Sequence, residues 1–181
     1  MRQLASLHDI DVSPENPWIQ QFKWISYLVY DEMDQDLRDF FHDFWRTINK
    51  MTAAHLCIIT CDIHPLRAEQ KTETQIEREF AFRETMNEKL GCTYETLPYL
   101  VFCESIDSDE YYIFKFNDPD NKKMLRSAIR YICVACEKSN NFDELQQHLI
   151  ASKYRELVRV HAPGFISRNL ISLLKVATSS I

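Results

Sequence analysis

The run Cys61-Asp62-Ile63-His64 is the part of this sequence whose residue types and spacing best suit chemistry. A cysteine becomes a nucleophile when a nearby imidazolium or a helix N-terminus lowers the pKa of its thiol, and His64 follows Cys61 closely. A single thiolate forms mixed disulfides or reacts with peroxide without a second cysteine. The alternative interpretation is a buried cysteine at the end of a core strand, next to Asp62, whose charge opposes thiolate formation.

The other cysteine patterns favour packing roles. Cys133-Val-Ala-Cys136 has the C-x-x-C spacing but lies inside a helical pattern, so we expect both sulfur atoms to face the core. His55, Cys57 and Cys61 share one face of a predicted strand, because side chains alternate along a strand. No second cluster has the spacing of zinc ligands, so we expect no metal site.

Glycine is scarce, since the 181 residues contain only Gly91 and Gly164. Loops that wrap phosphates use several glycines, because glycine adopts positive φ angles and lets an anion approach the backbone N–H groups. The P-loop and the G-x-G-x-x-G fingerprint are both absent, and no glycine-flanked serine supports hydrolase chemistry. We therefore expect no nucleotide bound through these motifs, and the sequence indicates no cofactor.

The net charge of −6 is distributed unevenly along the chain. Residues 151–181 carry five basic residues and one acidic residue, whereas the rest of the chain carries 16 basic and 26 acidic residues. This asymmetry predicts that the C-terminal segment has its own partner, and the acidic body of the chain is one candidate. Nucleic-acid binding through Lys153, Arg155, Arg159 and Arg168 is a weaker hypothesis, because the acidic body argues against it.

The composition is typical of a globular protein, with 45% hydrophobic and 27% charged residues. The first residues lack the apolar region of a secretory signal, and no apolar run approaches the ~18 residues of a membrane span. The six cysteines lie in or beside apolar runs, which favours reduced thiols. We expect a cytoplasmic protein that does not associate with a membrane.

Two strands and a helix are predicted in the first third of the chain. Residues 23–30 and 54–62 are short runs rich in apolar, aromatic and β-branched residues, and the second run is apolar on both faces. Between them, Asp34 is expected to cap a helix whose apolar residues recur every three or four positions. Residues 1–16 show no sustained periodicity, so we expect them to form a loop or arm.

A second helix is predicted from Thr72 to Leu90, with Gly91 as the residue that ends it. We expect four apolar residues on its inner face, namely Ile76, Phe80, Met86 and Leu90. Its glutamates are expected to lie in solvent, namely Glu73, Glu77, Glu79, Glu84 and Glu88.

A hairpin and three helices are predicted in the rest of the chain. Residues 98–104 and 110–116 favour antiparallel strands, because a short polar segment separates them. Asp118-Pro119 is expected to start a helix that runs to Lys138. A further helix is predicted over residues 142–160, and a last one begins near Phe165 after Pro163-Gly164.

This order of elements, with Pro98 opening the third strand in Leu97-Pro98-Tyr99, resembles the thioredoxin-like fold over residues 23–139. The resemblance implies a three-layer α/β/α domain with a four-stranded mixed sheet, and Pro98 stands at the cis-proline position of that fold, although the sequence leaves the isomer of this peptide bond open. It places Cys61 near the C-x-x-C position of that fold, where His64 replaces the second cysteine. Residues 1–22 are then an N-terminal arm, and residues 140–181 are a C-terminal helical extension.

Two hypotheses about function follow. The leading one is a non-catalytic interaction module that binds a protein partner, or a second copy of itself, through its C-terminal helices. The apolar residues expected to make that contact are Phe165, Ile166, Leu170, Leu173 and Leu174. The alternative is a thiol-dependent oxidoreductase or peroxidase-type enzyme, with Cys61 as nucleophile, His64 as its charge partner and Pro98 shaping the pocket.

Overall fold

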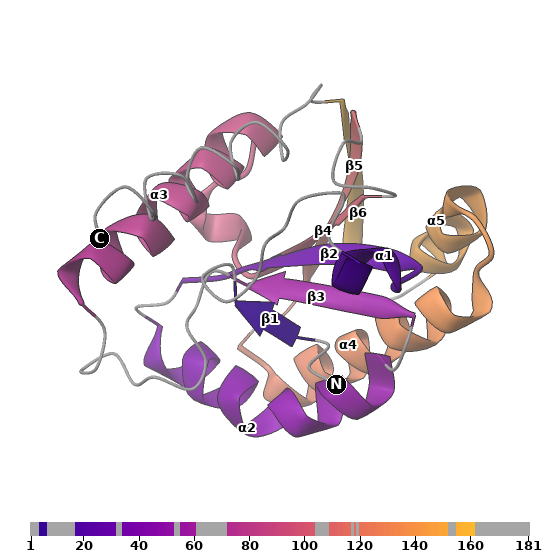
Figure 1. Cartoon of the computed structure of the whole chain (residues 1–181), viewed down its shortest axis with the longest axis horizontal. Helices are drawn as coiled ribbons and strands as arrows, with labels where there is room; N and C mark the ends of the chain where they lie inside the picture. Colours follow the sequence, from indigo (N-terminus) through magenta and orange to yellow (C-terminus); the bar gives the residue numbers. More distant parts are fainter. Residues whose placement is uncertain are drawn as a thin grey trace.

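A six-stranded mixed β-sheet forms the middle layer of the molecule (Figure 1). The computed structural model describes residues 4–6, 17–31, 34–52, 55–60, 72–103, 109–116, 118, 120–151 and 155–161. β1, β3 and β2 are parallel to one another, and β4, β5 and β6 each run antiparallel to the strand before them in the sheet. The spatial order is β1 (Leu4–Ser6), β3 (Leu56–Thr60), β2 (Trp24–Val29), β4 (Tyr99–Cys103), β5 (Glu110–Phe116) and β6 (Arg155–His161).

The predicted α/β domain with a mixed sheet is confirmed. The four predicted strands form the consecutive centre of the sheet, in the order β3-β2-β4-β5, and the β4–β5 hairpin is antiparallel as expected. Every residue of β2, β3 and β4 is buried, because helices cover both faces of the sheet. The sheet is larger than the predicted four strands because one further strand joins each edge.

Both edge strands correct the sequence-based predictions. β1 lies in the segment expected to be a loop or arm, and its three residues are too few to show a periodic pattern. β6 lies in the segment expected to be helical: α5 (Phe142–Ile150) ends early, and β6 pairs with the whole length of β5. The β-branched Val158 and Val160 alternate with Arg159, a pattern that favours a strand once an open strand edge is available.

Helices α2 (Gln35–Thr52), α4 (Lys122–Lys138) and α5 cover one face of the sheet (Figure 1). The N-terminus of α2 is capped as predicted, since the Leu37 N–H donates to Asp34 Oδ1 at 3.0 Å. The start predicted for α4 at Asp118 is wrong. Asn121 caps that helix, and its side chain accepts a hydrogen bond from the Met124 N–H at 3.2 Å.

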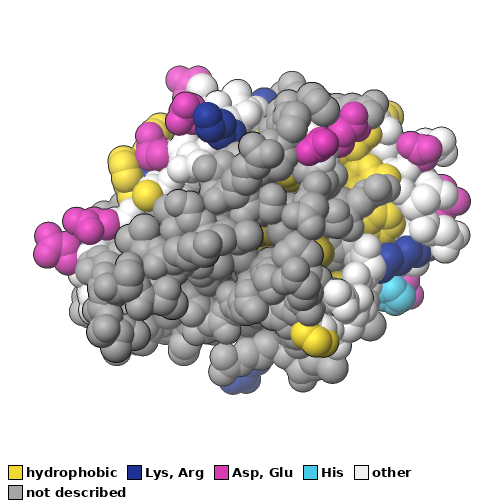
Figure 2. Space-filling view, turned by 45° about the horizontal axis from the view of Figure 1, so that its top comes forward, with side chains coloured by type: hydrophobic (Ala, Val, Ile, Leu, Met, Phe, Trp, Pro, Cys, Tyr) yellow, Lys and Arg dark blue, Asp and Glu magenta, His cyan; other side chains and the backbone are white. Residues whose placement is uncertain are grey.

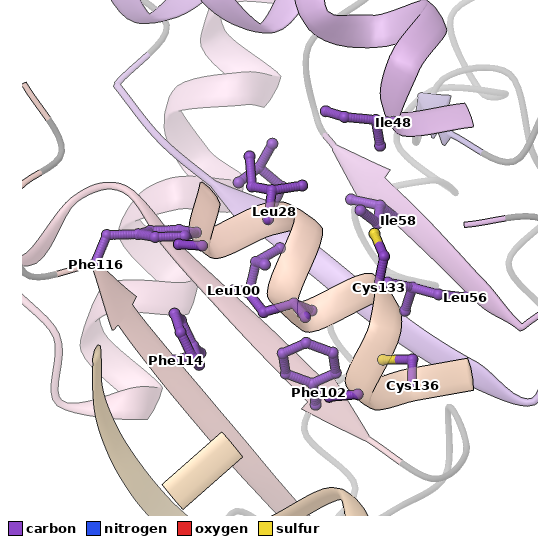
Figure 3. Packing of buried hydrophobic residues seen from close by; sticks show 14 of the residues in the cluster. Leu28, Ile48, Leu56, Ile58, Leu100, Phe102, Phe114, Phe116, Cys133 and Cys136 are labelled. Carbon is purple, nitrogen blue, oxygen red and sulfur yellow. The ribbon is translucent and has the colours of Figure 1, made fainter. Parts of the chain in front are cut away.

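The core on this face is mostly apolar. Figure 3 shows Cys133 and Cys136 of α4 pointing toward the strand residues Ile58 and Phe102. The apolar positions predicted for α4 are all buried, namely Leu125, Ala128, Ile129, Ile132 and Cys136. Trp24 ties β2 to the end of this helix, because its Nε1–H donates to the Cys136 carbonyl at 2.8 Å.

Helix α3 (Glu73–Leu90) covers the opposite face of the sheet, alone among the described helices of nine or more residues (Figure 1). Its predicted bounds are confirmed, and Gly91 after it has a φ of 65°, the left-handed conformation that glycine adopts readily. Two short helices complete the described structure, α1 (Pro17–Gln20) and the 3-10 helix η2 (Tyr94–Thr96). No helix in the described part of the chain is long and apolar enough to cross a membrane.

Candidate functional site

Most residues of the two predicted sites lie outside the described residues. This holds for Cys61 and His64, and for the predicted partner-binding residues Phe165, Ile166, Leu170, Leu173 and Leu174. Pro98 is described: it is buried, and the Leu97–Pro98 peptide bond is cis. Tyr99, the next residue, pairs with Val29, so Pro98 lies at the end of the sheet where Asp31 follows β2.

The five described cysteines are all free thiols and all buried, namely Cys57, Cys92, Cys103, Cys133 and Cys136. Burial raises the pKa of Cys57 and of Cys103 to about 12, because the interior disfavours a thiolate. Such thiols are neutral near neutral pH and make poor nucleophiles. These described cysteines therefore suit packing rather than catalysis.

Cys133 and Cys136 face the core, as predicted from their positions within a helical pattern. Both side chains are buried on the inner face of α4, toward the sheet (Figure 3). Burial raises the pKa of Cys133 to about 12 and raises that of Cys136 well above its ordinary value. The C-x-x-C spacing here reflects two core positions on one helix face.

The structure also brings together a serine and a histidine, Ser139 and His148, whose side chains lie 2.9 Å apart between Oγ and Nδ1. Ser139 is fully buried at the end of α4, and its hydroxyl donates to the Ala135 carbonyl at 2.7 Å. The hydroxyl proton is therefore not directed at the imidazole, which a hydrolytic nucleophile would require. The pair joins α4 to α5.

Helix α3 packs on the sheet through a face that is half polar. Phe82, Met86 and Leu90 contribute to the core on this side of the sheet, and the prediction that Met86 and Leu90 face inward is confirmed. Three polar residues, each one helical turn from the next, are buried with them, namely Glu79, Arg83 and Asn87. Glu79 is 1% exposed, so the prediction that it lies in solvent is wrong.

Two large apolar residues of α3 lie on its outer surface. Ile76 and Phe80 were expected to face inward, but they expose 41% and 49% of their surfaces. Tyr94 of η2 is also 49% exposed. The first half of α3 therefore departs from an ordinary amphipathic helix, because Glu79 and Arg83 are buried while Ile76 and Phe80 are exposed.

Arg83 connects these exposed rings to the end of β2. Its Nη1 lies 3.1 Å from Asp31 Oδ1, and its guanidinium carbon lies 5.3 Å from the ring centre of Phe80 and 5.2 Å from that of Tyr94. These are cation–π distances. Arg83 is 4% exposed, whereas both rings are half exposed, so a buried cation holds two aromatic rings at the surface.

Tyr94 makes a further contact with α3. Its hydroxyl donates to Oε1 of Glu84, and this hydrogen bond raises the pKa of Tyr94. We refer to Ile76, Phe80, Arg83, Glu84 and Tyr94 as the α3 patch. Its surroundings are acidic, because residues 72–96 include six acidic and three basic residues. On the left of Figure 2, over α3, exposed hydrophobic side chains lie next to acidic ones.

A second buried contact fixes α3 to the sheet one turn after Arg83. The Tyr99 hydroxyl donates to Asn87 Oδ1 at 2.8 Å, and both residues are buried. Because Tyr99 belongs to β4 and Asp31 follows β2, the polar residues of α3 contact two neighbouring strands at one end of the sheet. The α3 patch is therefore anchored to the sheet rather than carried on a loop.

No metal site is evident in the described residues. They contain no group of three or more histidine, cysteine, aspartate or glutamate side chains that could hold a metal ion. The chemistry available at the α3 patch is that of aromatic stacking, apolar contact and charge pairing. Comparisons with protein-family models, with curated proteins and with solved structures found no match to this chain.

The α3 patch was not predicted from the sequence, although the sequence contains one signal of it. Glu79, Arg83 and Asn87 recur at four-residue spacing, as residues on one helix face do. Phe80 and Ile76 show the same spacing on another face. Ile76 and Phe80 were predicted to face inward and Glu79 to face solvent, by residue type alone, and at these three positions that rule fails.

Proposed function

We propose that this chain is a non-catalytic protein-interaction module with a thioredoxin-like body. The observation that carries the proposal is the exposed aromatic pair at α3, where the buried Arg83 contacts the half-exposed rings of Phe80 and Tyr94. Monomeric proteins seldom group large exposed apolar side chains, and such groups are typical of contact surfaces for other proteins. Aromatic residues are also enriched among the residues that dominate binding energy.

Two further features support the thioredoxin-like body. The central strands follow the order β3-β2-β4-β5, with the last two antiparallel, and the helices between and after them lie on both faces of the sheet. Pro98, at the position that resembles the cis-proline position of that fold, directly precedes β4. The predicted C-terminal helix, with Phe165, Ile166, Leu170, Leu173 and Leu174, is a second partner-binding element in this proposal.

The non-catalytic part of the proposal is supported by the state of the described side chains. The five described cysteines are buried, and the Ser139–His148 pair is engaged in structural hydrogen bonds. Labelling with iodoacetamide over a range of pH tests this part directly. We expect Cys61 to react below neutral pH no faster than an ordinary thiol. Rapid labelling that His64→Ala slows would replace this proposal with the thiol-dependent enzyme.

The binding part of the proposal requires a partner that depends on the α3 patch. A photo-crosslinking amino acid placed at position 80 would trap the partner, which is then identified, purified and tested by calorimetry. We expect Phe80→Ala to weaken that complex by about tenfold or more, as loss of a central aromatic contact does. Val134→Ala is the matched control, because Val134 is 44% exposed on α4, on the other side of the sheet. Equal affinity of both variants would contradict the proposal.

A further inference from the structure

The face of the sheet under α3 is buried over a larger area than one helix covers. Its fully buried residues come from four adjacent strands, namely Cys57 and Ile59 of β3, Tyr27 and Val29 of β2, Tyr99, Val101 and Cys103 of β4, and Tyr111 and Ile113 of β5. Four strands of at least five residues form an area about 19 Å wide and about 17 Å long. A helix with its side chains is about 10–12 Å across, so α3 leaves part of this face uncovered in either orientation.

Helix α3 lies toward one end of the strands. It contacts Asp31, which follows β2, and Tyr99, which begins β4, and Figure 1 shows it on the side toward which the β3 arrow points. Cys103 and Tyr111 lie at the opposite end, because Cys103 ends β4 and Tyr111 comes one residue after the start of β5. Both side chains are 0% exposed, so a further segment of the chain covers this corner of the sheet.

Residues 162–181 begin at this corner. β6 ends at His161, and the residue before it, Val160, pairs with Tyr111. Adjacent strands are about 4.8 Å apart, so the segment starts beside β5 without a long connection. Twenty residues that start here can cross β5 and β4, because even a fully helical segment of this length extends for about 30 Å.

Two other stretches of ten or more residues lie outside the described residues, namely 7–16 and 61–71. They follow β1 and β3, which pair with each other on the side of the sheet away from β6. The first leads to α1 before β2, and the second leads to α3, so neither adjoins β5. The position of residues 162–181 therefore suits the buried corner best.

The composition of this segment also suits the place beside α3. The apolar residues Ile166, Leu170, Leu173 and Leu174 recur at the three- and four-residue spacing of one helix face. The segment includes Arg168 and Lys175 and no acidic residue, whereas α3 exposes three glutamates, namely Glu73, Glu77 and Glu88. A helix placed here would set its apolar face on the sheet and its positive charge next to those glutamates.

We propose that residues 162–181 pack as a helix on the α3 face of their own chain, over Cys103 and Tyr111, and that this contact competes with partner binding. Leu170 faces the sheet in this arrangement, and it also belongs to the predicted partner-binding residues. A partner that takes up the segment therefore uncovers the corner. Because the segment is tethered, its effective concentration at the sheet is on the order of millimolar. This inference rests on the proposed function, because it describes the regulation of one of its two binding elements.

Site-resolved labelling of the full chain with iodoacetamide tests the packing. Cys103 on the α3 face and Cys133 on the α4 face are a matched pair, because burial raises the pKa of each thiol to about 12. In Leu170→Glu we expect Cys103 to react at least about tenfold faster than in the wild type, since the local opening that exposes it becomes easier, while Cys133 keeps its rate. Val134→Glu, at an exposed position of α4, should leave both rates unchanged. A Cys103 that stays equally protected in Leu170→Glu would overturn the inference.

A photo-crosslinking amino acid in place of Leu170 locates the segment directly. Chains with and without a heavy-isotope label are mixed before irradiation, and the linked peptides are identified by mass spectrometry. We expect links to β4 or β5 within a single chain. Links to the α4 side of the sheet, or links that join labelled to unlabelled chains, would contradict the proposal. This measurement decides the case in which Leu170→Glu exposes both thiols equally through a general loss of stability.

A Fab fragment raised against a synthetic peptide of residues 162–181, with Leu170 in its epitope, tests the competition. We expect the Fab to bind the free peptide at least about tenfold more tightly than the full chain, because in the chain the segment must first leave the sheet. Binding to the chain should also speed the labelling of Cys103 but not that of Cys133. Equal affinities with Cys103 still protected would overturn the inference. If Phe80→Ala still weakens a purified complex in that case, the proposed function stands and only this regulation fails.

Discussion

The two faces of the sheet are covered by different kinds of helix surface. On one face, α2, α4 and α5 bury apolar side chains against β-strand residues such as Phe102 and Phe114. On the other face, α3 buries three polar residues, of which Arg83 and Asn87 contact groups at one end of the sheet. The face under α2, α4 and α5 carries most of the apolar packing. On the α3 face, a buried polar side chain, Arg83, positions two exposed aromatic rings. Departures from simple patterning of this kind often mark function.

The first prediction concerns the apolar face, where the largest loss of stability is expected. Phe102→Ala removes a fully buried ring from a central strand, and we expect the free energy of unfolding to fall by about 4 kcal/mol. Urea unfolding followed by circular dichroism measures this loss. Val134→Ala, at an exposed position of α4, should change the free energy of unfolding by less than about 0.5 kcal/mol. Similar losses in both variants would mean that the apolar face is not tightly packed.

The second prediction tests a property that the two faces share. Burial raises the pKa of Cys103, on the α3 side, and of Cys133, on the α4 side, from 9.0 to about 12. Between these values the unfolded chain loses a proton that the folded chain keeps. The stability due to each thiol is therefore complete below pH 9 and falls with rising pH by about 1.4 kcal/mol per unit.

The measurement is urea unfolding at several values between pH 9 and 11. We expect Cys103→Ala and Cys133→Ala each to make the decline with pH shallower by about 1.4 kcal/mol per unit, whatever their effect at pH 8. Conditions that exclude oxidation are needed, because free thiolates in the unfolded chain form disulfides. A decline that neither variant changes would show that these thiols are accessible to water in the folded protein.

The third prediction isolates the polar interior of the α3 face. Tyr99→Phe removes the hydroxyl that donates to Asn87 and leaves the Asn87 oxygen without this donor, so we expect a loss of about 1 kcal/mol. Asn87→Ala combined with Tyr99→Phe should cost less than the two single changes added together. Denaturant unfolding of all four proteins completes the cycle. Strict additivity would indicate that the hydrogen bond does not stabilise the fold.

The smallest effect on stability is expected at the α3 patch itself. Phe80→Ala removes a ring that is half exposed, so the free energy of unfolding should change by about 0.5 kcal/mol or less. The same variant should weaken binding at this surface by about tenfold or more. Thermal unfolding and a binding measurement on one preparation separate the two effects. A large loss of stability would make Phe80 a packing residue and would remove the contrast between the two faces.

The apolar face was largely predictable from the sequence. The cap at Asp34 and the spacing of the apolar residues in α4 are local signals, and a helix that packs one stripe onto an apolar sheet obeys them. Asn121, rather than the predicted Asp118, caps α4. The sequence did not separate them, because both asparagine and aspartate are suitable N-cap residues. Such errors move a boundary by a few residues without changing the architecture.

The α3 face and the sheet edges were less predictable because their structure depends on distant residues. Arg83 is buried against Asp31, which lies 52 residues away in the sequence, and no local pattern contains that contact. β6 is a strand because β5 offers it a partner, although its short apolar run also fits a helix. Burial of charge and pairing at an edge are both decided by tertiary structure.

The position of β6 has a consequence for synthesis of the chain. β5 is complete once residue 116 is made, but its partner strand ends at residue 161. In the nascent chain the backbone N–H and C=O groups along this side of β5 therefore remain unpaired until some 40 further residues, including those of β6, have been synthesised. An unpaired strand edge is a template for association with other chains, so β5 is open to such association during synthesis until β6 has emerged from the ribosome.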